Sequence, residues 1–228
     1  MGTHTHRTHE SGRTRAGVLG ANDGILSISG LMLGVAATHA DRPELLVAGI
    51  AGLVAGALSM GTGEYVSVSS QADIERADLE IERKALESDF AGESEELRQI
   101  YIRRGLDHEL ATQVARQLMQ HDALGAHARD EIGITDALSA RPLQAASASM
   151  ISFAVGGLVP FLAAYLAPAE RAVPAIAAVS LVALAALGAL AARAGGAMML
   201  RGALRILVWG TATMAVTSMI GSLIRTGV

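Results

Sequence analysis

The fold is decided by residues 45–90, where the apolar run LLVAGIAGLVAGALSMGTGEYVSV (45–68) passes directly into the charged run SSQADIERADLEIERKALESDF (69–90). The first run is long enough to cross the hydrocarbon core of a membrane, which takes about 20 helical residues. The second run keeps apolar residues at helical spacing, such as Ile74 and Ile81, with charges between them. No glycine or proline occurs from the end of the first run to Gly92, where we expect the helix to break. One long helix that leaves the membrane is therefore predicted.

Four other segments share the apolar character of the first run, and charged residues within the five are limited to Asp23, Glu64 and Arg205. The polar start of the chain carries no apolar stretch before the first span, so we expect no cleaved signal peptide. The sequence predicts an all-α membrane protein with five transmembrane helices. The predicted spans are Val18–Thr38, Leu45–Val68, Ala145–Leu166, Ala172–Ala192 and Gly202–Ile224.

The distribution of charge divides the chain into an acidic segment and a remainder that carries few charges. The 228 residues carry a formal net charge of −4, yet residues 69–141 hold sixteen of the 22 acidic residues and nine of the 18 basic ones. A hydrophobic content of 51% excludes a disordered chain, and the absence of cysteine excludes a disulfide scaffold. We therefore predict a polar, histidine-containing tail (1–15), two spans (16–68), an acidic helical domain (69–141) and three further spans (142–228).

The distribution of arginine predicts the orientation, because short loops rich in Lys and Arg stay on the cytoplasmic side. With the N-terminus inside, the tail and residues 69–141 are cytoplasmic, and only Arg42, Arg171 and Arg225 fall outside. Within the acidic domain, glycine and aspartate mark the helix ends. The predicted helices are Glu93–Arg104, ended by Gly105; His108–Gln120, capped by Asp107; and Ala123–Ile132, capped by Asp122.

The many carboxylates of the acidic domain fit either a solvated helical bundle or a cation site. Glu93 and Glu96 lie one helical turn apart, and His127 and Glu131 are an i, i+4 pair that could hold one ion. A Glu/His set without thiols suits Fe(II), Mn(II), Co(II) or Zn(II) better than Cu(I). The tail histidines His4, His6 and His9 either bind metal as well or are incidental, whereas His39, His108 and His121 are expected at the surface.

Charged residues at membrane depth are functional candidates by default. Asp23 lies in the first span and Glu64 in the second, where Met60 precedes Glu64 by one helical turn. A thioether beside carboxylates makes a weak site that an ion can leave again. The spacing of Gly20/Gly24, Gly30/Gly34 and Gly52/Gly56 predicts a close helix contact in the first two spans, either within a subunit or across a dimer.

Three stretches resemble the vacuolar iron transporter (VIT) family, including its bacterial members: GANDGILSISGLMLGVAA (20–37), AGLVAGALSMGTGEYVSVSSQADIERADLEIER (51–83) and QAASASMISFAVGGLVPFLAAYL (144–166). The resemblance implies a homodimer with five transmembrane helices per subunit and a cytoplasmic metal-binding domain between the second and third. It also implies export of Fe(II), often with Mn(II) or other divalent metals, from the cytosol in exchange for protons. For a bacterial member this means the inner membrane.

The resemblance also assigns roles to residues. Asp23 and Met60 match ion-path positions of the family at the dimer interface, and Glu82, Glu93, Glu96 and Glu131 match its metal-binding glutamates. His127 replaces a methionine ligand of plant relatives.

Two positions depart from the family pattern. Gly52 stands where plant relatives have an acid, so Glu64 becomes a candidate substitute in the path. Ala85 replaces a metal-binding glutamate, which leaves either fewer ions per domain or a substitute in Glu80 or Glu87.

The sequence thus predicts a transporter and not an enzyme. Its partners are divalent metal ions, protons and the lipid bilayer, with no permanently bound cofactor and no nucleic acid. The alternative is a membrane-anchored iron-binding or ferroxidase storage protein. Against it, the chain lacks the pair of Glu-x-x-His motifs of di-iron bundles.

Overall fold

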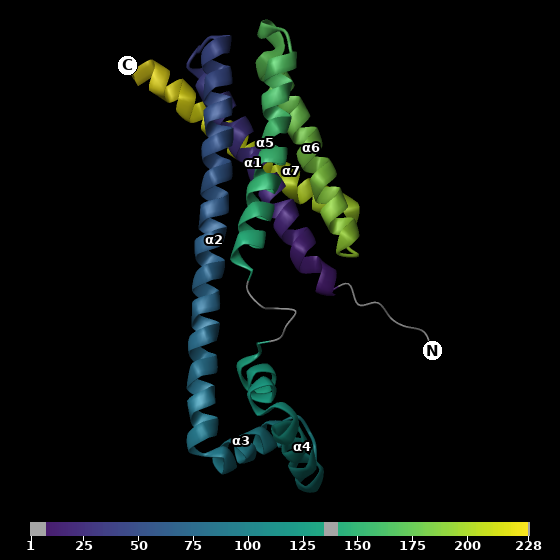
Figure 1. The fold of residues 1–228 in the computed structure, drawn as a ribbon. Helices are drawn as coiled ribbons and strands as arrows, with labels where there is room; N and C mark the ends of the chain where they lie inside the picture. Colours follow the sequence, from purple (N-terminus) through teal and green to yellow (C-terminus); the bar gives the residue numbers. More distant parts are fainter. Residues whose placement is uncertain (1–7, 135–140, 228) are drawn as a thin grey trace. The chain divides into compact units, whose positions relative to one another are not determined.

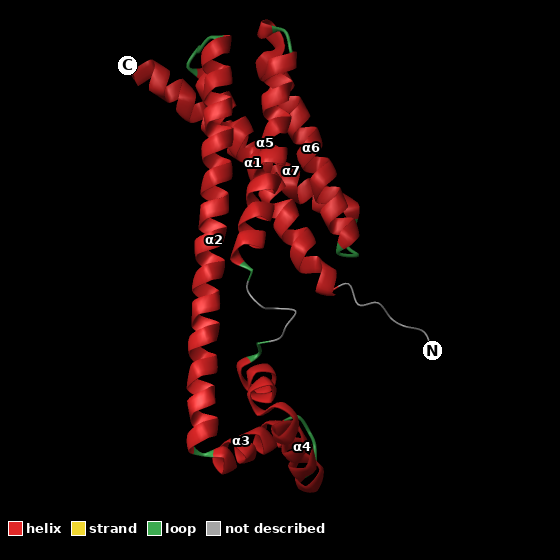
Figure 2. Ribbon diagram, viewed as in Figure 1, coloured by secondary structure: helices red, strands yellow, loops and turns green. Residues whose placement is uncertain are grey.

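The computed structural model describes residues 8–134 and 141–227. Its described part is helical, without any strand (Figures 1 and 2). The chain divides into two compact units, Met1–Tyr65 with Leu143–Val228, and Val66–Pro142. The elements are α1 (Thr8–Ala37), α2 (Arg42–Ser88), α3 (Phe90–Arg103), α4 (His108–His127), the π-helical turn η1 (Ala128–Ile132), α5 (Pro142–Leu166), the 3-10 turn η2 (Ala169–Arg171), α6 (Ala172–Ala194) and α7 (Met199–Gly227).

Five helices are long and apolar enough to cross a membrane, as the sequence predicts. They belong to α1, α2, α5, α6 and α7, with η2 leading into α6. The unit that contains most of them has a core around Ile28, Met32 and Ile176, none of which exposes more than 1% of its surface. Large apolar side chains such as Val54 and Leu58 are more than half exposed. This apolar exterior is what lipid contact requires.

Glycines bring α1 against the backbones of α5 and α7. A Cβ on Gly24 would lie 2.1 Å from the carbonyl oxygen of Phe153 in α5, and one on Gly34 would lie 3.2 Å from that of Thr217 in α7. Gly52 of α2 does face α1, where a Cβ would lie 2.4 Å from Leu31. The predicted close helix contact at these glycines is therefore confirmed, and within the chain the pairs in α1 face α5 and α7. The GxxxG spacing indicates that two helix backbones approach closely, but it does not determine which helix is the partner.

Helix α2 confirms the predicted continuous helix, because it runs without interruption from Arg42 to Ser88. Its start is a reciprocal cap, in which Glu44 N donates to Asp41 Oδ1 at 2.9 Å and Asp41 N donates to Glu44 Oε2 at 3.0 Å. The break comes before Gly92, which lies in the first turn of α3. Asp89 ends the run instead, since its carboxylate accepts a hydrogen bond from Gly92 N and caps α3.

The smaller unit has a core of its own, formed where α3 packs on α4. Leu97 and Ala115 are at most 1% exposed there. Gly105 ends the first of these helices with φ +100°, and Asp107 caps the next by accepting from Leu110 N, both as predicted. Asp122 also caps a turn as predicted, but it does so at a kink inside α4. The last predicted helix is therefore split between the end of α4 and η1.

Helix α1 begins at Thr8, ahead of the first predicted span. His4 and His6 lie outside the described residues, as does the side chain of His9. Helices α5, α6 and α7 each begin and end within three residues of the predicted spans.

Candidate metal centre

Three side chains from separate elements of the smaller unit converge on one point. Glu82 comes from α2, His127 from the last turn of α4 and Glu131 from η1. Nδ1 of His127 lies 2.8 Å from Glu131 Oε2 and 3.1 Å from Glu82 Oε1. One ligand atom from each residue lies within 4.8 Å of the others. A helix-borne imidazole thus lies beside two carboxylates, close enough for one atom of each of the three residues to bind the same cation.

Burial makes this cluster unlike the surface carboxylates around it. The side chain of His127 is fully buried and that of Glu82 is 9% exposed, whereas Glu131 is 33% exposed and opens the cluster to solvent. Carboxylates are rarely this buried unless they are paired or bind an ion.

The hydrogen bonds within the cluster leave two buried atoms without a partner. Nδ1 of His127 carries at most one proton, and we assign that proton to a hydrogen bond with Glu131 Oε2. One proton cannot serve both carboxylates, so Glu82 Oε1 stays close to Nδ1 but accepts no hydrogen bond from the described residues. Nε2 of His127 also has no partner among them. The orphaned oxygen of Glu82 calls for an explanation, and an ion bound beside Nδ1 is one. Such an ion would not reach Nε2, which lies on the other edge of the ring.

The pKa values of the cluster's carboxyls reflect burial first and crowding of negative charge second. Burial raises the pKa of the Glu82 carboxyl above its usual 4.5, although His127 acts to lower it. Glu131, Glu93 and Glu96 raise that pKa further by repulsion. Burial likewise raises the pKa of Glu93, with a further contribution from Glu96. A divalent cation would relieve the repulsion that these shifts report.

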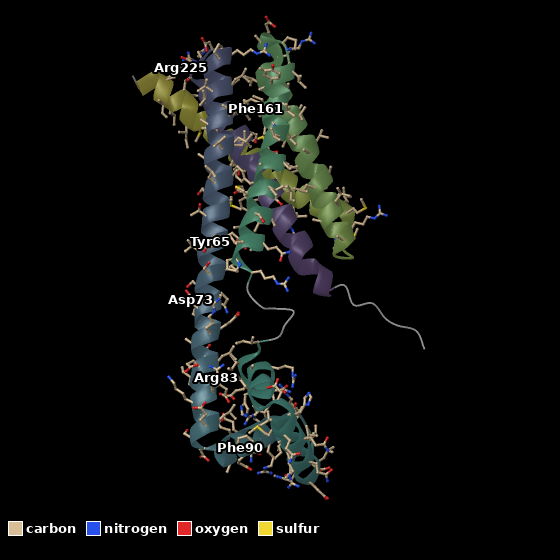
Figure 3. The ribbon with its side chains drawn as sticks, in the orientation of Figure 1. Tyr65, Asp73, Arg83, Phe90, Phe161 and Arg225 are labelled. Atoms are coloured by element: carbon tan, nitrogen blue, oxygen red, sulfur yellow. The ribbon has the colours of Figure 1, made fainter. Side chains whose placement is uncertain are left out.

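The other predicted ligands are not part of the converging set. Glu93 is half-buried and Glu96 exposed on α3, close enough to act on Glu82 through their charge. Of the proposed substitutes for the missing acid at Ala85, Glu80 pairs with Arg83 at 2.6 Å. Arg83 is labelled on α2 in Figure 3. Both members of this pair are about half exposed, so Glu80 faces solvent rather than the cluster.

A second group of contacts fixes η1 to α3. Asp130, next to Glu131, accepts hydrogen bonds from Tyr101 Oη at 2.8 Å and from Arg104 Nη1 at 2.5 Å. Arg104 Nη2 also donates to the backbone carbonyl of Asp130 at 3.0 Å, and its guanidinium lies 5.3 Å from the centre of the Tyr101 ring. Burial opposes ionisation of Asp130, but the hydrogen bonds from Arg104 and Tyr101 outweigh it and lower the pKa of this carboxyl.

The membrane candidates lie in the other unit. Asp23 in α1 is half-buried and accepts a hydrogen bond from Ser27 Oγ at 3.0 Å. Beside it, Asn22 Oδ1 is buried without a hydrogen-bond partner among the described residues. Met60 and Glu64 of α2 are also half-buried, and Met60 packs against the core. No hydrogen bond or ion pair among the described side chains joins Asp23 to either of them.

Sequence reasoning alone found the His127/Glu131 pair but missed two features. The resemblance supplied Glu82, whose pairing with His127 depends on the tertiary fold. The contact of Arg104 and Tyr101 with Asp130 could not be predicted from the spacing of these residues in the sequence. The surface positions expected for His39, His108 and His121 are confirmed, since all three are exposed.

Five helices that are long and apolar enough to cross a membrane place this chain in the class of multi-pass membrane proteins. The chain belongs to the VIT family, whose sequence profile matches residues 14–222. It is therefore a membrane transporter and not an enzyme.

Individual relatives agree with this assignment. A vacuolar iron transporter of Acanthamoeba castellanii is 48% identical over 217 residues, which cover 95% of this chain and 80% of that protein. Vacuolar iron transporter homolog 1 of Oryza sativa subsp. japonica is 53% identical over 83 residues, 36% of each chain. Homolog 2 of the same plant is 37% identical over 148 residues, 65% of this chain and 56% of that protein.

Proposed function

We propose that this protein exports Fe(II) from the cytoplasm in exchange for protons, with Mn(II) as a second cargo. The observation that carries the proposal is the buried cluster of Glu82, His127 and Glu131 in a chain whose relatives are named vacuolar iron transporters. In this proposal the acidic unit gathers the ion, and the membrane helices move it.

The spacing within the cluster supports a metal ligand set. Metal–ligand bonds of about 2.1 Å put neighbouring ligand atoms of an octahedral ion about 3.0 Å apart. The two oxygens at 2.8 and 3.1 Å from His127 Nδ1 are at this spacing. An ion bound to Nδ1 of His127 would displace the proton from that atom, and the ring would stay neutral by carrying its proton on Nε2. The two carboxylates of Glu82 and Glu131 would then balance the two positive charges of the ion.

The donor types support a borderline divalent cation. Imidazole and carboxylate ligands without sulfur suit Fe(II), Mn(II), Co(II) and Zn(II). The charges of Glu93 and Glu96 act on the cluster from α3, so they raise the local concentration of cations and are proposed as outer ligands. Three protein ligands leave coordination positions to water, which suits a site that must release its ion.

For the membrane path we propose Asp23, Met60 and Glu64. Asp23 offers a carboxylate, and the neighbouring Asn22 oxygen, buried without a described partner, is a further oxygen ligand. Met60 adds a soft thioether that binds Fe(II) weakly, and Glu64 provides a second protonatable group on α2. Protons arriving from the far side would compete with the metal for both carboxylates and so drive its release.

We also propose a homodimer in the bacterial inner membrane, with the N-terminus and the smaller unit in the cytoplasm. The arginine distribution supports this orientation. A monomeric mass from light scattering in detergent would refute the dimer, and cytoplasmic protection of a label on Arg171→Cys would refute the orientation.

Transport is tested in proteoliposomes loaded with a divalent-metal indicator and a pH dye, under oxygen-free, reducing conditions. Asp23→Asn is expected to abolish Fe(II) uptake and the coupled proton flux. Asp41→Asn is the matched control, because Asp41 is an exposed cap at the start of α2 and its loss is expected to leave transport intact. Full transport by Asp23→Asn would refute the path, and Fe(II) uptake without proton movement would refute the exchange.

A further inference from the structure

Glu131, one of the three converging side chains, lies in the short π-helical turn η1. This turn has five residues, Ala128–Ile132, and ends at Gly133 with φ +86°. Hydrogen bonds from the backbone N–H groups of Gly133 and Ile134 converge on the carbonyl of Ala128. Single π turns are rare, and they occur mostly at functional sites. Because η1 is a single turn that ends in a left-handed glycine, contacts from outside the turn help to keep Glu131 in place.

The contacts with Asp130 anchor η1 from outside the turn. Both carboxylate oxygens of Asp130 are engaged, one by Tyr101 Oη and the other by Arg104 Nη1. The side chain of Asp130 is only 9% exposed, whereas that of Arg104 is 46% exposed, so the carboxylate is buried beneath the guanidinium that binds it. Tyr101 and Arg104 both belong to the end of α3 or its cap, and α3 is itself packed on α4. The anchor therefore ties η1 to a helix with a fixed place in the core.

The bond to the Asp130 carbonyl matters most for Glu131. Arg104 Nη2 donates to the carbonyl oxygen of Asp130 at 3.0 Å. That carbonyl belongs to the same planar peptide unit as the N–H of Glu131. The guanidinium thus fixes the orientation of the peptide from which Glu131 starts, as well as the side chain before it.

We propose that Arg104 and Tyr101 are positioning residues that hold η1, through Asp130, in the conformation that aligns Glu131 with His127 and Glu82. This inference rests on the proposed metal-binding role of that cluster. Neither residue touches the ion. Their effect on metal affinity is indirect, as for other outer partners of metal ligands, whose loss typically weakens binding by about 10- to 100-fold.

The test uses the full-length protein in detergent, with His4, His6 and His9 replaced by glutamine so that the tail adds no ligands. Co(II) is the probe, because its visible absorption reports coordination geometry as well as occupancy. Arg104→Gln is expected to weaken Co(II) binding by about 10- to 100-fold and to change the spectrum of the bound ion. Arg104→Lys keeps the charge but not the planar fork, so partial rescue is expected.

Two further variants separate positioning from stability. Tyr101→Phe removes one hydrogen bond with little change of shape and is expected to weaken binding by at most about tenfold. Arg98→Gln is the matched control, since Arg98 lies on the same helix and pairs with Glu95 through two contacts, at 2.5 and 2.6 Å. No hydrogen bond or ion pair of the described residues joins Arg98 to η1, so the Co(II) affinity and spectrum of this variant are expected to equal those of the parent.

Outcomes that overturn the inference are distinct from those that overturn the metal site. Unchanged Co(II) affinity and spectrum in Arg104→Gln and Tyr101→Phe would refute the positioning role, as would an equal loss in Arg98→Gln. If Glu82→Gln and Glu131→Gln bind Co(II) as tightly as the parent, the metal site itself is wrong. Loss of binding in Glu82→Gln with no effect of Arg104→Gln would refute the positioning role alone.

Discussion

Replacing Gly24, the residue after Asp23, by alanine is expected to force α1 away from α5. The added Cβ would lie 2.1 Å from the carbonyl oxygen of Phe153 and 2.7 Å from the backbone nitrogen of Gly157. An ordinary contact needs about 3.4 Å, so the helices must separate by about 1 Å, and backbone atoms cannot rotate aside as a side chain would. Overpacking of this kind costs about 1–3 kcal/mol.

The expected net effect of Gly24→Ala follows from two opposing contributions. The upper end of the overpacking range applies because both close atoms are backbone, and alanine returns about 0.5–1 kcal/mol through its better helix propensity. The net loss is therefore about 2 kcal/mol, which corresponds to roughly 4–8 °C in Tm for a chain of this size.

Thermal unfolding in detergent, followed by size-exclusion chromatography of the heated sample, measures this loss. Gly63→Ala is the matched control, because Gly63 also lies within a helix but a Cβ there meets nothing within 4 Å. The control is expected to keep or raise the Tm. A Tm for Gly24→Ala equal to or above that of Gly63→Ala would refute the close packing of α1 on α5.

The remaining predictions concern the smaller unit. Lowering the pH from 7 toward 5 is expected to weaken Mn(II) binding, because the raised pKa values of Glu82 and Glu93 let protons compete at a higher pH than at an ordinary carboxylate. Titrations followed by electron paramagnetic resonance would contradict this if the affinity stayed constant down to pH 4.5. His127→Ala is expected to lose about 2–4 kcal/mol of stability together with metal binding, whereas the exposed His121→Ala loses neither. Calorimetry that finds equal losses for both would contradict the burial argument. Asp122→Ala is expected to cost about 0.5–2 kcal/mol through loss of its cap, measured as a lower Tm.

Local signals in the sequence predicted the local structure well. The absence of glycine and proline after Val68 correctly indicated the continuous α2, and Asp107 and Asp122 were correctly identified as caps. The break was misplaced at Gly92 because glycine is tolerated in a first helical turn, whereas the carboxylate of Asp89 stabilises a new helix start.

Contacts between distant segments could not be predicted in the same way. The i, i+4 pair of His127 and Glu131 follows from helix geometry alone, but the approach of Glu82 depends on how α2 and α4 pack. Arg104 had no feature that distinguished it from the adjacent Arg103 before the fold placed it against Asp130. Partner choice among helices is a property of the whole core rather than of any one spacing.

The glycine contacts of α1 restrict how a path beside Asp23 could open. Its backbone meets that of α5 at Gly24 and Gly156, and that of α7 near its other end, where a Cβ on Gly221 would lie 2.1 Å from the Gly34 carbonyl. A rotation of α1 by one residue, about 100°, would turn a side chain into one of these contacts. These contacts therefore oppose rotation or sliding of α1 by itself, and they hold the helix that carries Asp23 against α5 and α7.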